Sequence, residues 1–348
     1  MSVQESRAPA SPDRAALHEF VAKHQRFLLT THVNPDGDAI GSEVAFAAWL
    51  LAAGKHVRIL NDSPTPPAFR YLTEGYLSEV YDEALCEQRF AEADALVVLD
   101  TSNKQRIGRL ARHLELHAIA VAIVDHHATH DGFGKVNVIE PDIAATASLV
   151  YELMRESAHV LDARTAEAIY VGLSTDTGNF RYSNTDAKAH HLAAELVRLG
   201  VQPQATYERV HATAPPGRLR FFGEALAGLT MLEDGRLAVL EVAPEQFARH
   251  GLIGADTEGL VDMPRVIQGV EVVALFSEVE AGKVKVSLRS TGRVSIDQVC
   301  VRLGGGGHEH AAGVQLRGSR DDAKSRILPE IAKLLAALAA APAGGRGA

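Results

Sequence analysis

Cysteine is scarce in this chain. Only Cys86 and Cys300 occur among its 348 residues, and they lie far apart in the sequence. The pair matches no zinc-ligand spacing, which indicates a reduced, cytosolic setting. We interpret both as small, buried, apolar residues.

Aromatic side chains and positive charge are also in short supply. Aromatics make up 5% of the residues, which argues against a broad stacking platform for long single strands. The formal net charge is -9, whereas a protein that binds long nucleic acid through electrostatics alone is usually basic. Both shortages favour a small substrate or a short strand. Site aspartates that face metal ions need not repel an anion.

Long apolar runs are missing as well. The longest strand-like run extends from Ala118 to Val124, far short of the roughly 20 residues that a membrane-spanning helix needs. The N-terminal sequence M-S-V-Q-E-S-R-A-P-A has no apolar signal-peptide core. We therefore expect a cytoplasmic protein without a membrane partner.

Strand and helix patterns alternate over the first 200 residues. Short apolar runs begin at Arg26, Val57, Ala95 and Ala118, and helix formers fill stretches between and after them, such as Ala39 to Ala53. This alternation predicts β-α-β units. The expected fold class is α/β, with a mostly parallel, doubly wound sheet in the N-terminal domain.

The pattern changes after Gly200. The polar segment Pro203 to Gly217 is interpreted as a domain connection, and the glycine run Gly304 to Gly307 is expected to precede a helix. Strand-like segments lie between them: Ala225 to Glu233, Arg236 to Val242, Gly269 to Ser277 and Lys283 to Arg289. We predict a smaller α/β C-terminal domain. The expected boundaries are a tail (1–14), the N-terminal domain (15–200), a linker (201–217), the C-terminal domain (218–340) and a second tail (341–348).

Aspartate and histidine residues at the ends of apolar runs are the most informative feature. They are His32, Asp36 and Asp38 in T-H-V-N-P-D-G-D, Asp100 in L-V-V-L-D, Asp125, His126 and His127 in A-I-V-D-H-H, and Asp176 in G-L-S-T-D-T-G. Parallel strands would deliver such side chains to one edge of a sheet. Taken singly, each residue could have an ordinary structural role, such as Asp36 as a helix N-cap. Together they suit a pair of Mn²⁺-type ions, and two metals about 3.5–4 Å apart are suited to phosphate-ester cleavage.

These motifs resemble those of the DHH phosphoesterase superfamily. The matching segments are H-x-N-P-D-G-D-x-x-G-S, L-D, D-H-H and S-T-D-T-G, and G-G-G-G-H-x-x-A-A-G at Gly304 to Gly313 is similar to the signature of its DHHA1 domain. The resemblance covers about residues 15 to 320. The compact length and R-S-T-G at Arg289 to Gly292 are most similar to the NrnA type. Proteins of that type degrade very short oligonucleotides and remove the 3′-phosphate of adenosine 3′,5′-bisphosphate (pAp).

The resemblance implies a role for each position. Six residues would bind two Mn²⁺ ions, with Mg²⁺ or Co²⁺ as alternatives: His32 and Asp36 one ion, Asp38 and His126 the other, Asp100 both, and Asp176 completing the set. His127 would act beside the scissile phosphate without binding metal, and Asp125 would orient a ring N–H or the local turn. The chemistry would be a two-metal hydrolysis in a cleft between the two domains.

A second group of residues is expected to bind the substrate. Arg289 could hold a phosphate through two parallel hydrogen bonds. Backbone amides of Gly305, Gly306 and Gly307 could cradle a phosphate, with His308 opening the next helix and Ser290 beside Arg289. Taken alone, the glycine run could also be a flexible hinge.

The leading hypothesis is a Mn²⁺-dependent phosphoesterase that acts on pAp and on short oligonucleotides from the 5′ end. A cyclic-di-AMP or pApA phosphodiesterase would use the same metals and stays open. A RecJ-like exonuclease is disfavoured by the chain length, and a family II pyrophosphatase by the glycine-rich motif. An inactive nucleotide-binding sensor is disfavoured because every expected ligand is present. Expected partners are short oligonucleotides and nucleotide bisphosphates, with a homodimer as an option.

Overall fold

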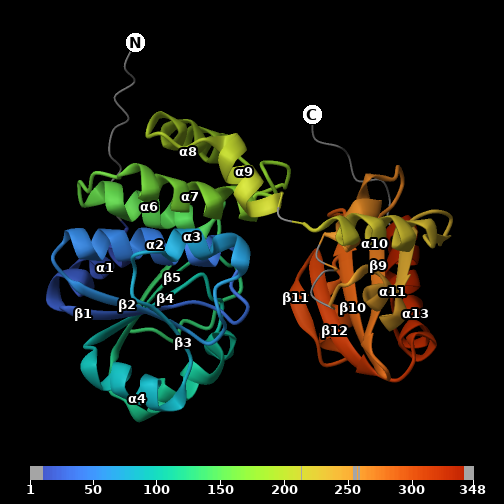
Figure 1. Cartoon of the computed structure of the whole chain (residues 1–348), viewed down its shortest axis with the longest axis horizontal. Helices are drawn as coiled ribbons and strands as arrows, with labels where there is room; N and C mark the ends of the chain where they lie inside the picture. Colours follow the sequence, from blue (N-terminus) through green and yellow to red (C-terminus); the bar gives the residue numbers. More distant parts are fainter. Residues whose placement is uncertain (1–10, 213, 254–256, 258, 341–348) are drawn as a thin grey trace. The chain divides into compact units, whose positions relative to one another are not determined.

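Two six-stranded sheets organise the chain (Figure 1). The structure is a computed structural model that describes residues 11–212, 214–253, 257 and 259–340. The chain divides into two compact units, residues 1–213 and 214–348. Each unit contains one of the sheets and has its own hydrophobic core.

The sheet of the N-terminal unit is parallel throughout. Its strands are β1 (Arg26–Thr30), β2 (His56–Asn61), β3 (Ser78–Val80), β4 (Ala95–Leu99), β5 (Ala120–Asp125) and β6 (Val136–Ile139). Their order is β3-β2-β1-β4-β5-β6, with every neighbouring pair parallel. The order reverses between β1 and β4, and ligands of open α/β sheets bind at the carboxyl ends of strands that flank such a reversal.

Helices cover both faces of this sheet, which explains why its strands are continuous apolar runs. Phe27 and Leu29 of β1 share a core with α1 (Pro12–Lys23), α2 (Gly37–Ala52), α6 (Thr146–Glu156), α7 (Ala163–Asp176) and α8 (Ala187–Arg198). Leu28 points to the other face, which carries α4 (Glu83–Glu92), η2 (Lys104–Arg112) and α5 (His113–Leu116). The shorter elements are η1 (Pro67–Phe69), α3 (Arg70–Thr73) and α9 (Pro203–His211).

The sheet of the C-terminal unit is mixed. Its strands are β7 (Thr230–Leu232), β8 (Leu237–Val242), β9 (Val272–Glu280), β10 (Lys283–Ser290), β11 (Gly306–His308) and β12 (Ala311–Arg317), in the order β11-β12-β10-β9-β8-β7. β8 and β9 run parallel, and the other neighbours are antiparallel. One face carries α12 (Asp297–Val301) and α13 (Arg320–Ala340), and the other α10 (Pro216–Ala227), α11 (Pro244–His250) and η4 (Leu260–Val266). The predicted α/β fold class is thus confirmed for both units.

The strand predicted over 225–233 was wrong, because this stretch contains the end of α10 and the short β7. Residues 203–211, within the expected linker, form helix α9. Pro216 stands at the first position of α10, and Phe221 and Ala225 are buried four residues apart, which is helical spacing. Over the described ranges, no helix combines the length and the apolar character needed to cross a membrane.

Candidate metal centre and phosphate-binding residues

The predicted metal ligands meet where the strand order reverses. His32 follows β1 by two residues, Asp100 directly follows β4, and Asp125 is the last residue of β5. Asp176 is the last residue of helix α7 and not of a strand. Contacts between α2 and α7 bring this helix end to the sheet edge.

His32, Asp36 and Asp100 form the first cluster. Nε2 of His32 lies 3.5 Å from Oδ2 of Asp100 and 3.8 Å from Oδ2 of Asp36. Nδ1 of His32 lies 2.9 Å from the carbonyl oxygen of Val33 and donates its proton there, so Nε2 faces the carboxylates, donating to them when the ring is protonated and offering a lone pair when it is neutral. Asp36 is also the N-cap of α2, through Oδ1. The helix cap therefore leaves the other carboxylate oxygen facing His32.

Asp38, His126 and Asp176 form the second cluster. Nε2 of His126 lies 3.4 Å from Oδ2 of Asp176 and 3.9 Å from Oδ2 of Asp38. Nδ1 of His126 is 3.2 Å from the carbonyl oxygen of Ile143, which again leaves Nε2 as the lone-pair nitrogen. Asp38 is held by the first turn of α6, where the amide of Thr146 donates to its Oδ2 at 2.7 Å.

Asp100 lies between the two clusters. Its Oδ2 faces His32 at 3.5 Å, and its Oδ1 lies 3.7 Å from Nε2 of His126. The hydroxyl of Thr146 donates to Oδ1 at 2.9 Å, and Asp100 adopts a left-handed backbone with φ of 55°. A carboxylate with one oxygen toward each cluster has the shape required of a bridging ligand.

The two clusters bring together buried carboxylates whose negative charge bound cations would balance. Burial and the negative charge of Asp100 raise the pKa values of Asp38 and Asp176 well above their ordinary range. Burial opposes ionisation of Asp100 too, but the hydrogen bond from His32 and the charge of His126 outweigh it and lower its pKa. The clusters hold four carboxylates, those of Asp36, Asp38, Asp100 and Asp176. Two divalent cations would balance these charges, so the residues present fit such a pair.

His127 is held by Asp125. Oδ1 of Asp125 lies 2.7 Å from Nδ1 of His127 and accepts the backbone amides of His126 and His127 at 2.9 and 3.3 Å. Nδ1 of His127 is farther from Asp100, at 3.8 Å. His130, which the sequence analysis did not single out, is nearly buried and places Nε2 3.6 Å from the other oxygen of Asp125. Asp125 therefore orients the His127 ring.

Arg289 and Ser290 occupy the end of β10. The Arg289 guanidinium is partly exposed, and its Nε lies 3.4 Å from Oδ1 of Asp262. Arg289 and His308 both pair with Ala311 of β12, so their backbones lie at the same end of the sheet. The buried Ser290 hydroxyl accepts the amide of Gly292 at 3.1 Å, which occupies it within the turn.

The glycine run was predicted to open a helix, and this is wrong. Residues 306–308 form strand β11, which pairs with β12. A Cβ at Gly305 would lie 2.3 Å from the carbonyl oxygen of Gly313, and one at Gly307 would lie 2.5 Å from that of Ala311. Close packing against β12 therefore explains both glycines, whereas Gly306 borders open space. The side chain of His308 lies outside the described part of the structure.

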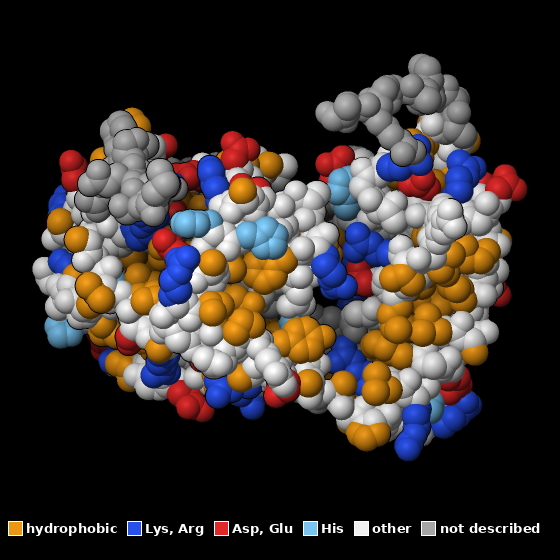
Figure 2. Space-filling model, turned by 90° about the horizontal axis from the view of Figure 1, so that it is seen from above, with side chains coloured by type: hydrophobic (Ala, Val, Ile, Leu, Met, Phe, Trp, Pro, Cys, Tyr) orange, Lys and Arg blue, Asp and Glu red, His pale blue; other side chains and the backbone are white. Residues whose placement is uncertain are grey.

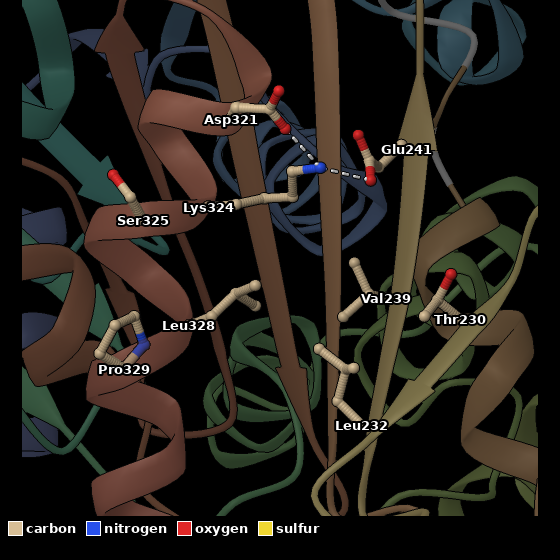
Figure 3. Close-up of a pocket in the computed structure, with 9 residues that line it drawn as sticks. All are labelled: Thr230, Leu232, Val239, Glu241, Asp321, Lys324, Ser325, Leu328 and Pro329. Atoms are coloured by element: carbon tan, nitrogen blue, oxygen red, sulfur yellow. Dashed lines mark hydrogen bonds and ion pairs between the residues drawn. The ribbon is translucent and has the colours of Figure 1, made fainter.

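A pocket elsewhere in the C-terminal unit contains none of these residues. It has a volume of about 430 Å³ and lies between α13 and strands β7 and β8. Lys324 spans its rim, with Nζ 2.8 Å from both Glu241 and Asp321 (Figure 3). These ion pairs already satisfy the charged groups of the rim.

Comparison with known proteins identifies the family. Residues 26–173 match the family model described as DHH family, N-terminal domain, and residues 234–339 match the DHHA1 domain. The chain is 33% identical to a Thermus thermophilus protein named bifunctional oligoribonuclease and PAP phosphatase NrnA, over 87% of this chain and 88% of that protein. The chain belongs to the DHH phosphoesterase family. A Bacillus subtilis protein of the same name is 26% identical, over 90% of this DHH protein and 96% of the relative.

Solved structures agree with this assignment. An exopolyphosphatase-related protein from Bacteroides fragilis matches this DHH protein with a TM-score of 0.90 and 25% identity, covering 96% of this chain and 99% of the other. RecJ from Thermus thermophilus, in complex with Mn²⁺, shares the fold with a TM-score of 0.52 and 16% identity, over 97% of this chain and 56% of RecJ. The predicted enzyme class, a metal-dependent phosphoesterase, is confirmed by the family.

The buried Glu43 side chain is linked through Asn61 to the loop that leads to His32, and its titration gives a testable prediction. Its Oε2 accepts Nδ2 of Asn61 at 2.9 Å, and Asn61 in turn accepts the amide of Thr31 next to His32. Burial raises the pKa of Glu43 to about 8. The native protein therefore retains a proton that the unfolded chain releases, and stability should fall as the pH rises toward that value.

Glu43→Gln should remove this part of the pH dependence. Relative to the variant, we expect the wild-type protein to lose on the order of 3 kcal/mol of unfolding free energy between about pH 5 and about pH 8. Denaturant unfolding of both proteins across this range measures the difference, because other titrating groups are common to both. Parallel stability profiles would show that Glu43 is ionised in the native state.

Proposed function

We propose that this DHH protein is a Mn²⁺-dependent phosphoesterase that removes the 3′-phosphate of pAp and hydrolyses very short oligonucleotides from the 5′ end. The observation that carries the proposal is the pair of Asp/His clusters on either side of Asp100. The names of the Thermus and Bacillus relatives support the choice of substrates.

Each cluster would hold one cation. His32, Asp36 and one oxygen of Asp100 would bind the first, and Asp38, His126, Asp176 and the other oxygen of Asp100 would bind the second. Divalent cations at these positions supply Lewis-acid stabilisation of the phosphoryl oxygens and favour deprotonation of water. Mixed imidazole and carboxylate ligands suit Mn²⁺, with Mg²⁺ or Co²⁺ as substitutes.

The remaining residues would bind and orient the phosphate. We assign His127 to donate a hydrogen bond to a phosphoryl oxygen, because Asp125 fixes the orientation of its ring. Arg289, with Gly306 and His308 at the same end of its sheet, would hold a second phosphate or the nucleotide.

Arg289→Ala tests the assignment of substrate binding. A charge-assisted hydrogen bond contributes about 1.5–3 kcal/mol, so kcat/KM should fall roughly 10- to 150-fold while the metal content stays unchanged. Arg289→Lys should recover part of the loss, because an ammonium group lacks the planar fork. The matched control is Arg293→Ala. Arg293 is an exposed arginine in the turn that follows β10, and it pairs with Glu271. Loss of metal from Arg289→Ala, or an unchanged kcat/KM on every substrate, would contradict the assignment.

A side-by-side kinetic comparison tests the substrates. The chelated protein, reloaded with Mn²⁺, would be assayed on pAp, pApA, cyclic-di-AMP, oligonucleotides of two to five residues and a long strand. We expect hydrolysis of pAp and of the short oligonucleotides, with rates that fall steeply beyond about five residues because a closed site holds few nucleotides. A preference for cyclic-di-AMP or pApA would favour the alternative phosphodiesterase. Equal rates on the long strand would indicate a RecJ-like enzyme, and no turnover an inactive sensor.

A homodimer is also proposed. Figure 2 shows apolar side chains exposed on the C-terminal unit. The exposed apolar residues of this unit include Leu219, Ile253 and Val266. Exposed apolar groups of this kind are suited to contact with another protein surface. Sedimentation velocity should show a dimer, and a monomer at every concentration would contradict this part of the proposal.

A further inference from the structure

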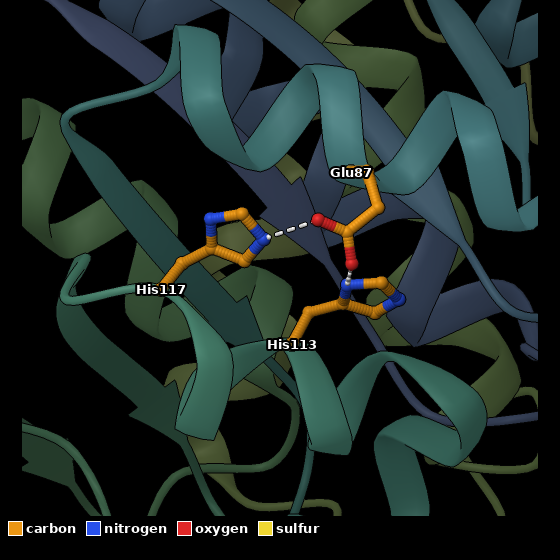
Figure 4. Close-up of side chains that lie close together, drawn as sticks. All are labelled: Glu87, His113 and His117. Atoms are coloured by element: carbon orange, nitrogen blue, oxygen red, sulfur yellow. Dashed lines mark hydrogen bonds and ion pairs between the residues drawn. The ribbon is translucent and has the colours of Figure 1, made fainter.

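A second kind of His and carboxylate cluster lies in the helical layer formed by α4 and α5. Glu87 projects from α4, His113 is the first residue of α5, and His117 directly follows that helix (Figure 4). Oε1 of Glu87 lies 3.2 Å from Nδ1 of His113, and Oε2 lies 3.0 Å from Nε2 of His117. One ligand atom from each residue lies within 4.8 Å of the others. The cluster belongs to the face of the sheet opposite α2, α6 and α7, and none of its residues belongs to the Asp100 clusters.

The ring nitrogens of His113 are buried without well-formed hydrogen bonds to the described residues. Its side chain is 0% exposed, and among the described residues neither ring nitrogen meets the geometry of a hydrogen bond, although Nδ1 lies 3.2 Å from Oε1 of Glu87. The ring stacks on Phe90 at a centroid distance of 5.2 Å, which holds it in place with Nδ1 toward Glu87. Burying polar nitrogens without partners costs free energy, so such a ring needs another explanation. A cation between His113 and Glu87 would supply the missing partner.

Among the described residues, Glu87 forms ion pairs with the two histidines and with no lysine or arginine. Arg112 pairs with Glu83, and Lys104 pairs with Glu115 at 2.7 Å. Glu87 itself is nearly half exposed and contacts the two imidazoles. His117 holds Oε2 of Glu87 in a hydrogen bond of 3.0 Å, and a metal ion would bind all three groups.

The ligand types and their spacing indicate which ion would bind. Histidines four residues apart lie on one side of a helical turn, a spacing found in zinc sites. Two imidazoles and one carboxylate are a known zinc ligand set that leaves a fourth position for water. Imidazole-rich sites also favour Zn²⁺ over Mn²⁺ and Mg²⁺. We propose that Glu87, His113 and His117 form an additional cation site of Zn²⁺ type, distinct from the two Asp/His clusters at the sheet edge.

A Zn²⁺ ion at this position would connect α4 with α5. These helices precede β4 and β5, the strands that lead to Asp100 and Asp125. Binding to the folded state alone raises its stability. The site should therefore affect thermal stability, while the phosphoesterase reaction itself needs none of these three residues.

Zinc content measured on the Mn²⁺-loaded full chain tests the site. The wild-type protein, Glu87→Gln, His117→Ala and a matched control would be equilibrated with buffered Zn²⁺, separated from free ion and analysed for both metals. The control is His191→Ala, which removes an exposed histidine that contacts Glu195 one helical turn away. The wild type and the control should retain one more Zn²⁺ per chain than the other two variants. The Mn²⁺-dependent turnover of all four proteins should be similar.

The change in Tm on addition of Zn²⁺ is a second measurement, which keeps the test decisive if His117→Ala folds poorly. Zn²⁺ should raise the Tm of the wild type and of His191→Ala but not that of Glu87→Gln, a substitution that keeps the size and shape of the side chain. Equal zinc content in wild type and Glu87→Gln, or an equal Tm increase in both, would overturn the proposal. Neither measurement depends on which nucleotide this enzyme hydrolyses.

Discussion

Replacing Asp100 with alanine is expected to cause the largest loss of activity of any single change. Its two oxygens face the two clusters, so Asp100→Ala removes a ligand from both proposed cations at once. Metal ions contribute several kcal/mol of transition-state stabilisation, so kcat should fall at least about 10³-fold. Assays with added Mn²⁺, combined with metal analysis of the purified variant, measure both losses.

Two further variants make the Asp100 result specific. Asp100→Asn keeps the shape of the side chain and an oxygen that can accept the Thr146 hydroxyl, so it should fold while still losing metal. Asp142→Ala changes an exposed aspartate on the same unit and should leave metal content and turnover unchanged. Two bound ions and near-normal turnover in Asp100→Ala would refute the bridging role.

The adjacent histidines of the D-H-H motif should respond in different ways. Nε2 of His126 faces Asp38, Asp100 and Asp176, so His126→Ala should lose one ion together with turnover. Nδ1 of His127 is held by Asp125, so His127→Ala should keep both ions and lower kcat by about 10²–10³-fold through loss of a donor to the phosphate. Metal content and kcat of both variants, measured in parallel, separate the two roles. Loss of an ion from His127→Ala would show that it binds metal.

Much of the fold and the members of the two clusters could be predicted from the sequence. The apolar runs before His32, Asp100 and Asp125 are strands β1, β4 and β5, and their carboxyl ends meet because the sheet is parallel. The closeness of Asp176 to these strand ends was not predictable from local pattern. It depends on how α7 packs against α2, which is a property of the folded chain.

The residues that support the clusters were not predicted, because their roles arise from tertiary contacts. Thr146 reaches Asp100 and Asp38 from the start of α6, more than 40 residues away in the sequence. The carbonyl groups of Val33 and Ile143 select the tautomers of His32 and His126, and backbone groups leave no trace in composition. Asn61 supports the loop before His32 in a similar way.

The glycine run shows how a motif can be recognised while its local structure is misjudged. Consecutive glycines before a histidine suggested a helix N-terminus that binds phosphate. Instead, Gly305 and Gly307 allow β11 to approach β12, a requirement that only the strand pairing reveals. The expected strand at 225–233 failed for a related reason, since apolar side chains at helical spacing were interpreted as a strand.

Diffraction from Mn²⁺-loaded crystals, with anomalous data collected at the manganese edge, tests the central claim most directly. We expect two anomalous peaks about 3.5–4 Å apart, one on each side of the Asp100 carboxylate, with His32 beside one peak and His126 beside the other. A single peak, or two peaks that do not share Asp100 as a ligand, would contradict the two-metal centre proposed for this DHH phosphoesterase.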